Sequence, residues 1–210
     1  MSTTVIVYDG RMGRWEPDAR GRLAKAALEL YSQQGFDQTT VEEIARQAGL
    51  TERTFFRHFA DKREVLFWGA AALETELLAG LDVAPTSAGA FDLVAAAVGV
   101  IAADFEPRRE FARRRQLIIN ANAELQERER IKLASLASAL GAALRRRGVG
   151  DTAAILAGEM GIAVFRVGFE RWIDPSNRKT FADIVRDSFE ELKLVVASPP
   201  GGGAYLSDGE

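Results

Sequence analysis

The sequence predicts an all-α protein of about nine helices, and three observations lead to this expectation. Alanine, leucine and arginine dominate, and the alternation of apolar and polar residues that is typical of β-strands is nearly absent. Apolar residues instead recur three and four positions apart, which places them on one face of a helix. Proline is sparse, with six residues, and falls at the boundaries of these segments, where it interrupts no helix.

The first helix is predicted to follow a flexible N-terminal arm. This arm covers residues 1–16, with Arg11 and Arg14 near its end. Pro17 suits the first turn of a helix, where its missing N–H group is not needed. Gly35 fits the position just after the last turn of a helix. We therefore expect the first helix between these two residues.

Two short helices are predicted next. Thr40 begins the second helix, because Glu43 three residues later completes a capping-box pattern. Gly49 ends this helix. Thr51 begins the third helix, which runs to about His58.

A longer fourth helix is predicted to begin at Asp61, where Glu64 repeats the capping pattern, and to extend to about Leu81. The segment Asp82–Ala88 is a linker, because its sequence DVAPTSA lacks helical periodicity. Five more helices and a disordered tail are then expected, the helices at 90–105, 107–119, 122–147, 152–172 and 178–197 and the tail at 198–210.

The composition excludes several kinds of site. The 210 residues include no cysteine, so disulfides and thiolate metal sites are excluded. The single histidine, His58, excludes a metal site built on several histidines. There is also no glycine-rich phosphate loop and no Glu-x-x-His di-metal motif. We therefore expect no metal, no cofactor and no catalytic residues, and an enzyme is the less favoured class.

The start of the chain and its longest apolar runs indicate where in the cell the protein is expected. The first residues, MSTTVIVYDG, lack the basic start and long apolar run of a signal peptide. No stretch has 18 uninterrupted apolar residues, so no transmembrane helix is expected. The sequence therefore predicts a cytoplasmic protein without a membrane partner.

The stretch Thr40–Phe59, TVEEIARQAGLTERTFFRHF, has the plan of a helix-turn-helix. Two short helices flank a tight turn that contains glycine, and in this motif the second helix enters the major groove of DNA. We therefore expect a DNA-binding domain over residues 17–66, with the motif at 40–59, and a second helical domain over residues 67–197.

Net charge does not carry this expectation. The whole chain has a net charge of -3, and residues 17–66 hold eight basic and eight acidic residues. A case for DNA binding must therefore rest on where the charges lie.

Residues 35–66, GFDQTTVEEIARQAGLTERTFFRHFADKREVL, resemble the N-terminal domain of the tetracycline-repressor (TetR) family. The family pattern is G-[FY]-x-x-[TS]-[TS]-V-x-x-I-A-x-x-A-G-V-[ST]-x-x-T-[LF]-Y-x-[HY]-F-x-[DS]-K-x-x-L, and nearly every defined position matches. Leu50 replaces the usual valine. Phe56 replaces a tyrosine whose hydroxyl commonly contacts a phosphate.

The resemblance implies which residues meet DNA. Thr40 and Lys62 would bind phosphates, and the start of the third helix would meet base edges. Arg53 can donate two hydrogen bonds to guanine, and Glu52 can accept one from cytosine. The full candidate set is Thr40, Thr51, Glu52, Arg53, Thr54, Phe56, Arg57, His58 and Lys62.

Structural interpretations stand beside these roles. Thr40 and Glu43 could form a capping box and nothing more. Glu52 could do no more than stabilise the start of the helix through a favourable interaction with the helix dipole. The side chains of Phe55 and Phe59 are expected in the core. Arg46 could be solvated or could touch a phosphate. Four further arginines could follow the DNA backbone or minor groove, or could merely fray, and these are Arg11, Arg14, Arg20 and Arg22.

The family resemblance further implies a homodimer through the last two helices, 152–172 and 178–197. The first of these carries small residues, among them Ala154, Gly158 and Gly161, that permit close helix approach. An intramolecular core would give the same pattern. A dimer is also needed geometrically for two recognition helices to contact a palindrome.

The segments 113–129, 144–149 and 164–174 resemble a subgroup of these regulators that includes the regulator of mycofactocin genes and is associated with acyl-CoA-like ligands. This resemblance implies an apolar pocket with a basic mouth. The candidates for its walls are Phe105, Leu117, Ile118, Met160, Phe165 and Phe169. At the mouth, Arg113, Arg114 and Arg115 could hold a phosphate or carboxylate. Aromatic residues at this spacing are also typical of an ordinary core, and an arginine run is typical of a solvated face.

The function expected from these observations is that of a DNA-binding transcriptional regulator, a repressor released from a palindromic operator by a small apolar or acyl-type ligand. The alternatives are an enzyme or a ligand sensor on the same helical fold without DNA binding.

Overall fold

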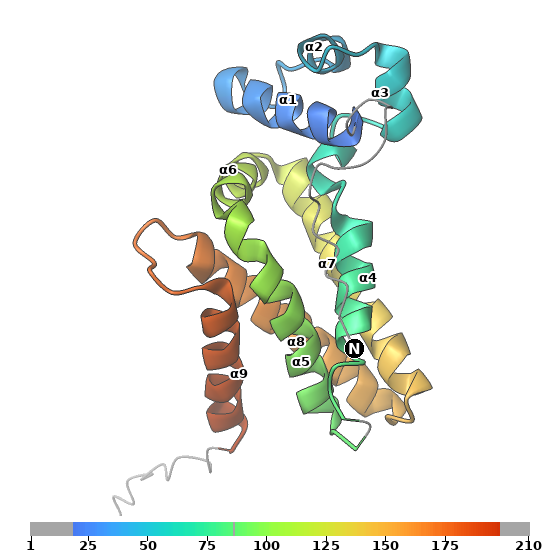
Figure 1. Ribbon diagram of the computed structural model, residues 1–210, viewed down its shortest axis with the longest axis vertical. Helices are drawn as coiled ribbons and strands as arrows, with labels where there is room; N and C mark the ends of the chain where they lie inside the picture. Colours follow the sequence, from blue (N-terminus) through green and yellow to red (C-terminus); the bar gives the residue numbers. More distant parts are fainter. Residues whose placement is uncertain (1–18, 86, 198–210) are drawn as a thin grey trace, which may run out of the picture. The chain divides into compact units, whose positions relative to one another are not determined.

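The computed structural model describes residues 19–85 and 87–197, and α-helices carry the fold of this part of the chain (Figure 1). The all-α class expected from the sequence is confirmed. The predicted arm at 1–16, with Arg11, Arg14 and the helix start at Pro17, lies outside the described residues, as does the predicted tail at 198–210.

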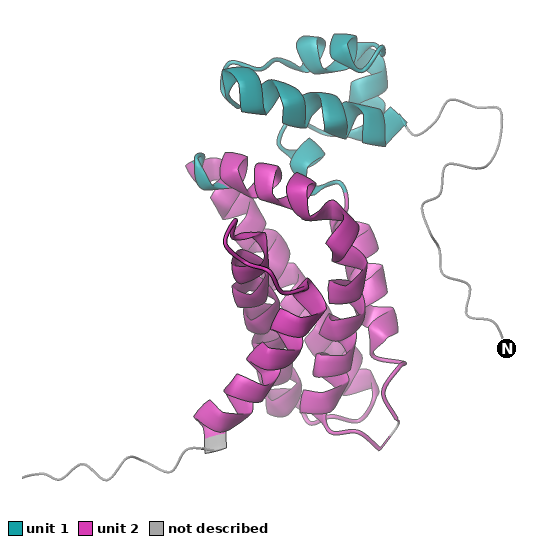
Figure 2. Ribbon diagram, turned by 60° about the vertical axis from the view of Figure 1, so that its left-hand side comes forward, with its two compact units in different colours: residues 1–68, 120–122 teal, residues 69–119, 123–210 magenta. Residues whose placement is uncertain are grey.

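The described chain divides into two compact units (Figure 2). The first contains residues up to 68 together with 120–122, and the second contains 69–119 and the residues from 123 onward. Each unit has its own buried apolar side chains.

The first unit is formed by α1 (Ala19–Gln34), α2 (Val41–Gln47), α3 (Glu52–His58) and the short 3-10 helix η1 (Glu64–Phe67). α1 packs against α2 and η1, and α2 packs against α3. The buried side chains include Leu23, Ala27, Tyr31, Phe36, Ile44, Phe55, Phe59, Val65 and Leu66. The core positions predicted for Phe55 and Phe59 are therefore confirmed.

The single helix predicted to run from Asp61 to Leu81 is wrong. The chain forms η1, breaks at Trp68 and Gly69, and then begins α4 (Ala70–Gly80). Gly69 has a ψ of -5°, whereas a regular α-helix has a ψ of about -42°. Glycine is a poor helix former, so this position favours the break. The carboxylate of Asp61 accepts two backbone N–H groups of the following turn, but the N-cap residue of η1 is Arg63, whose side chain makes no capping hydrogen bond.

The second unit contains α4 and the helices that follow the linker. These are α5 (Ala90–Phe105), the 3-10 helix η2 (Glu106–Arg108), α6 (Arg109–Asn120), α7 (Ala123–Arg146), α8 (Asp151–Ile173) and α9 (Phe181–Ala197). Each predicted boundary from residue 90 onward lies within three residues of the observed one. α9 begins late because Thr180 caps it, its hydroxyl accepting the N–H group of Asp183 at 3.1 Å.

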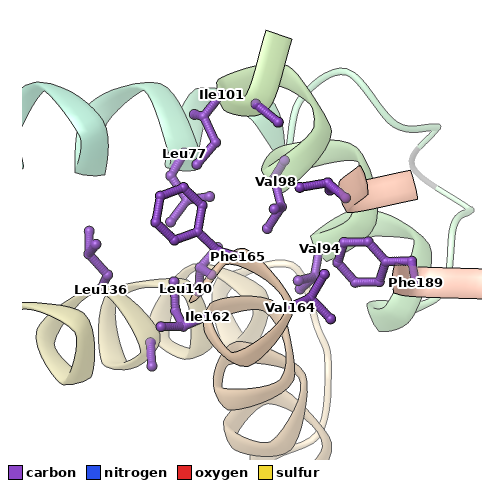
Figure 3. Close-up of a cluster of buried hydrophobic side chains, with 14 of the residues drawn as sticks. Leu77, Val94, Val98, Ile101, Leu136, Leu140, Ile162, Val164, Phe165 and Phe189 are labelled. Atoms are coloured by element: carbon purple, nitrogen blue, oxygen red, sulfur yellow. The ribbon is translucent and has the colours of Figure 1, made fainter. Parts of the chain in front are cut away.

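The core of the second unit lies around α8, which packs against α5, α7 and α9. Figure 3 shows side chains from several helices meeting there, among them Leu77 of α4, Val94 of α5, Leu140 of α7, Phe165 of α8 and Phe189 of α9. Apolar side chains from helices distant in sequence thus form one continuous hydrophobic core in this unit.

By length and composition alone, α8 could cross a membrane, with a mean hydropathy of 1.4 over its most apolar window. The expectation from uninterrupted apolar runs missed this feature, because charged residues interrupt the helix without removing its apolar character. Of that window, 44% is buried within the chain. A core helix passes the same test of length and composition, so this observation is weak evidence for a membrane span.

Candidate nucleic-acid interface

Threonine side chains begin both helices of the motif. The hydroxyl of Thr40 accepts the N–H group of Glu43 at 3.2 Å, and the carboxylate of Glu43 accepts the N–H group of Thr40 at 2.9 Å. This is a complete capping box. Thr51 caps α3 in the simpler manner, its hydroxyl accepting the N–H group of Thr54 at 3.2 Å. The predicted capping roles are confirmed, and the phosphate contact of Thr40 stays a prediction.

The capping box also has an electrostatic signature. The N–H group of Thr40, followed by its hydroxyl, donates to the carboxylate of Glu43 and holds the pKa of this carboxyl below its ordinary value. The charged form of Glu43 is therefore the form that completes the box.

The turn between α2 and α3 depends on glycine and on an arginine of α1. Gly49 has a φ of +66°, a conformation that other residues rarely adopt. The Nε atom of Arg22 donates to the carbonyl oxygen of Ala48 at 3.0 Å, and its Nη2 atom donates to that of Gly49 at 3.2 Å. Arg22 thus joins α1 to the turn that sets the angle between the two helices of the motif.

The two faces of α3 differ in exposure. Phe55 is fully buried, and the capping residue Phe59 is nearly so. The opposite face carries the exposed side chains Glu52, Arg53, Phe56 and Arg57. The structure therefore brings four of the predicted DNA-binding residues together on one exposed surface, which we call the α3 outer face.

Thr54 and His58 flank this surface and are half-buried. The hydroxyl of Thr54 lies 3.1 Å from that of Thr51. The imidazole Nε2 atom of His58 lies 3.5 Å from the guanidinium of Arg57. Arg46 is exposed on α2 and forms an ion pair of 3.5 Å with Glu42, which is also exposed.

Lys62 lies in a different environment from the one its predicted role requires. Its ammonium group donates to the backbone carbonyl oxygens of Phe36, Asp37 and Thr39 at 2.8, 3.2 and 3.0 Å. A lysine ammonium has three N–H donors, so these three contacts use all of them. The buried phenol of Tyr31 donates to the carbonyl oxygen of Lys62 at 2.7 Å. Lys62 thus holds the α1–α2 turn, and its phosphate contact stays a prediction.

The structural roles of three residues in this geometry were not found from the sequence. Arg22 and Tyr31 act through hydrogen bonds across 26 and 31 positions. Thr39 is buried, and its hydroxyl donates to the carbonyl oxygen of Gly35 at 2.7 Å. Only Thr39, four positions after the helix-ending Gly35, offered a local signal, because small polar side chains bond back to nearby backbone.

The aromatic candidates for the ligand site meet within the second unit. The ring of Phe105 lies 5.9 Å from that of Phe165 and 6.2 Å from that of Phe169. Trp172 and Phe181, stacked 5.1 Å apart, complete the same cluster. These rings pack in offset and edge-to-face contacts typical of a core.

The other ligand candidates differ in their surroundings, and Met160 packs against the same core cluster as the aromatic rings. Ile118 is buried and Met160 is half-buried, whereas Leu117 is 65% exposed on α6. The guanidinium of Arg115 forms an ion pair of 3.0 Å with Glu129, and burial lowers the pKa of Arg115. The guanidinium of Arg115, which was expected at the mouth of the pocket, is therefore paired with a carboxylate of the same chain.

A cavity of about 260 Å³ opens between α5 and α9. Its walls include Phe91, Ala95 and Gly99 of α5 and Ala182, Val185 and Phe189 of α9. None of the predicted ligand residues lines it. Within residues 19–85 and 87–197, no group of three or more His, Cys, Asp or Glu side chains could hold a metal ion.

Sequence comparison with known proteins finds matches to the part of the chain that contains the helix-turn-helix. Residues 23–67 match the family model described as "Bacterial regulatory proteins, tetR family". The transcriptional regulator TcmR of Streptomyces glaucescens is 47% identical over 66 residues, which are 31% of this chain and 29% of TcmR. A protein named as a mycofactocin biosynthesis transcriptional regulator, MftR of Mycobacterium tuberculosis, is 34% identical over 74 residues, which are 35% of this chain and 37% of MftR.

The matched segments therefore span about a third of those two relatives. One solved structure extends the likeness to the fold of most of the chain. It is the transcriptional regulator FadR of Bacillus subtilis in complex with stearoyl-CoA, with a TM-score of 0.55, 18% identity and coverage of 86% of this chain and 99% of FadR. Residues 23–67 thus carry the N-terminal domain of the TetR family of bacterial regulatory proteins, on a chain that shares its fold with a solved transcriptional regulator.

Proposed function

We propose that the protein is a sequence-specific transcriptional regulator that binds a palindromic DNA operator in the cytoplasm. The observation that carries the proposal is the capped helix-turn-helix with the α3 outer face exposed. Thr51 fixes the start of α3, and Phe55 anchors its inner side. The outer side is left with an acid, two arginines and a phenylalanine, which are the side-chain types that contact base edges and phosphates.

Individual roles follow from this placement. Arg53, in the first turn of α3, would contact guanine through its guanidinium, and Glu52 would accept from cytosine. Thr51 and Thr54 would lie close to base edges at the N-terminal end of the helix, and Arg57 and His58 would meet the groove edge or backbone. Thr40 would bind a phosphate at the start of α2.

We propose that the protein acts as a homodimer through α8 and α9. Large apolar side chains are exposed on both helices, Ile155 and Leu156 on α8 and Leu194 and Val195 on α9, with exposures between 52% and 69%. Large apolar side chains left exposed on a folded chain are candidates for burial in a protein interface. A dimer also supplies the two recognition helices that a palindrome requires.

The proposed effector is a small apolar or acyl-type ligand that releases the protein from DNA, so that the protein acts as a repressor. FadR of Bacillus subtilis, whose fold the chain shares, was solved with stearoyl-CoA. Phe105, Phe165 and Phe169 form an aromatic cluster that such a ligand would have to open or replace. The relatives are named as regulators, and the proposal assigns no catalytic step to the chain.

Selection of binding sites from random duplex DNA with the purified protein tests the proposal. A palindrome should be enriched, and its affinity should fall with salt by a slope of about -0.9 per phosphate contacted. Arg53→Ala should relax the sequence preference at one symmetric position. Enrichment of no sequence, with affinity equal for all duplexes, would contradict the proposed function.

The dimer is tested separately by the molar mass of the protein in solution. Leu156→Arg should convert the dimer to a monomer, because it places a charge within the proposed interface. Ile131→Arg is the matched control, since Ile131 is 60% exposed on α7. A wild-type monomer at micromolar concentration would contradict the dimer.

A further inference from the structure

We propose that Phe56 is a specificity-determining residue that contacts the C5-methyl group of thymine in the major groove. The inference rests on the DNA-binding function proposed above and identifies one base in the half-site. The side chain of Phe56 is 55% exposed in the unit that carries the helix-turn-helix, whereas that of its neighbour Phe55 is fully buried. A phenyl ring has no hydrogen-bonding atom, so Phe56 cannot donate the hydrogen bond to a phosphate that a tyrosine hydroxyl can donate.

Phe56 lies between two candidate base-contacting residues. With about 100° of rotation per residue, the order around the outer face of α3 is Glu52, Phe56, Arg53 and then Arg57. The exposed ring is thus flanked by a carboxylate on one side and a guanidinium on the other. A groove that accepts Arg53 and Glu52 must also accept the ring between them.

The ring is also held in place before any DNA arrives. It lies edge-to-face against the ring of Phe55, with centroids 5.5 Å apart. Phe55 in turn packs against Phe59, at a centroid distance of 5.5 Å. An exposed side chain ordered in this way loses less conformational freedom on binding than a mobile one.

The chemistry of the major groove identifies the partner. Three of the four bases present only hydrogen-bonding atoms there, whereas thymine also presents an apolar methyl group. Phenylalanine is one of the side chains that form apolar contacts with this methyl group. Burial of one methyl group is worth about fourfold in affinity per half-site, which is about 16-fold for a symmetric dimer.

The experiment uses the palindrome enriched in the selection described above. Each symmetric pair of thymines is replaced in turn by deoxyuridine, which lacks only the methyl group. The wild-type protein should lose roughly tenfold or more in affinity at one pair. Phe56→Ala should bind the thymine duplex more weakly and show no further loss with deoxyuridine at that pair. Phe111→Ala, at an exposed phenylalanine of α6, should retain the wild-type response.

Three outcomes would overturn the inference while leaving the proposed function intact. The enriched half-site could contain no thymine, the wild-type protein could bind every uracil duplex as tightly as the thymine duplex, or Phe56→Ala could remain as sensitive as the wild type. Phe56→Leu keeps an apolar side chain and should keep part of the loss of affinity caused by deoxyuridine. This variant therefore still tests the inference if Phe56→Ala does not fold. If no palindrome is enriched, the proposed function fails first.

Discussion

The ammonium group of Lys62 lies over the ring of Phe36, 4.4 Å from its centroid, and donates a hydrogen bond of 2.8 Å to the Phe36 carbonyl oxygen. The same group closes the α1–α2 turn by binding two further carbonyls. A half-buried charged residue that matches a DNA-binding motif thus holds the α1–α2 turn in place.

Lys62→Met should lower the free energy of unfolding by about 1–2 kcal/mol, because hydrogen bonds to a charged donor are lost and carbonyls are left unpaired. Affinity for DNA should fall for all sequences alike, and an unchanged slope of affinity against salt would indicate that Lys62 acts only through the turn. Lys25→Met, at an exposed lysine of α1, is the control. A slope that becomes shallower by about 0.9 per half-site would instead identify Lys62 as a phosphate ligand.

Thr51→Ala should destabilise α3 by about 1 kcal/mol, because the N–H group of Thr54 loses its acceptor. Thr51→Ser keeps the hydroxyl and should retain most of the stability. Amide hydrogen exchange measures the effect directly, since the Thr54 amide should exchange faster in the alanine variant than in the serine variant. Equal exchange in both variants would show that the cap is not stabilising.

The capping box at Glu43 should make the stability of the first unit depend on pH. The Glu43 pKa is lowered in the folded chain by the N–H group and hydroxyl of Thr40. Its contribution is therefore present above the ordinary glutamate pKa of about 4.3 and is lost as the pH falls through the lowered folded value. The melting temperature of the wild type should exceed that of Glu43→Gln at pH 7, and the difference should shrink as the pH falls below the ordinary glutamate pKa of about 4.3. A difference that does not change with pH would rule out this origin.

Gly158→Ala should destabilise the packing of α7 on α8. A Cβ atom at this position would lie 2.5 Å from the carbonyl oxygen of Ala137 and 3.1 Å from the backbone nitrogen of Gly141. Backbone atoms cannot move aside locally, so the cost should be about 1–3 kcal/mol and exceed the gain in helix propensity. Denaturant unfolding measures it.

Gly99→Ala is the matched control for this substitution, because a Cβ atom there would have no neighbour within 4 Å. It should stabilise α5 by about 0.5–1 kcal/mol. Equal effects of the two substitutions would show that α7 and α8 do not approach as closely as described.

The helix starts were predictable because each depends on residues a few positions apart. Thr40 with Glu43 and Thr51 with Thr54 satisfy backbone N–H groups within one turn, so the spacing in the sequence contains the whole interaction. The break at Gly69 was missed because a helical pattern of apolar residues continues through it, while the hydrogen bonding does not.

The candidate site could be predicted only in part for the same reason. The sequence motif identified the residues of the α3 outer face, and the inward position of Phe55 follows from helical spacing. That Lys62 points to the α1–α2 turn, and that Arg115 pairs with Glu129, could not be inferred, since long side chains choose among partners that only the fold brings near.

The sequence by itself determined the all-α class, most helix boundaries and the helix-turn-helix, because capping, glycine stops and apolar periodicity act within a few residues. The tertiary structure decided which charged side chains are internal supports and which stay exposed. Arg22 reaches Ala48 and Lys62 reaches Phe36 across 26 positions each, and the fold alone sets these distances. For Phe56, the sequence determines its position on α3, whereas the tertiary structure determines its exposure, because other parts of the unit could have covered it.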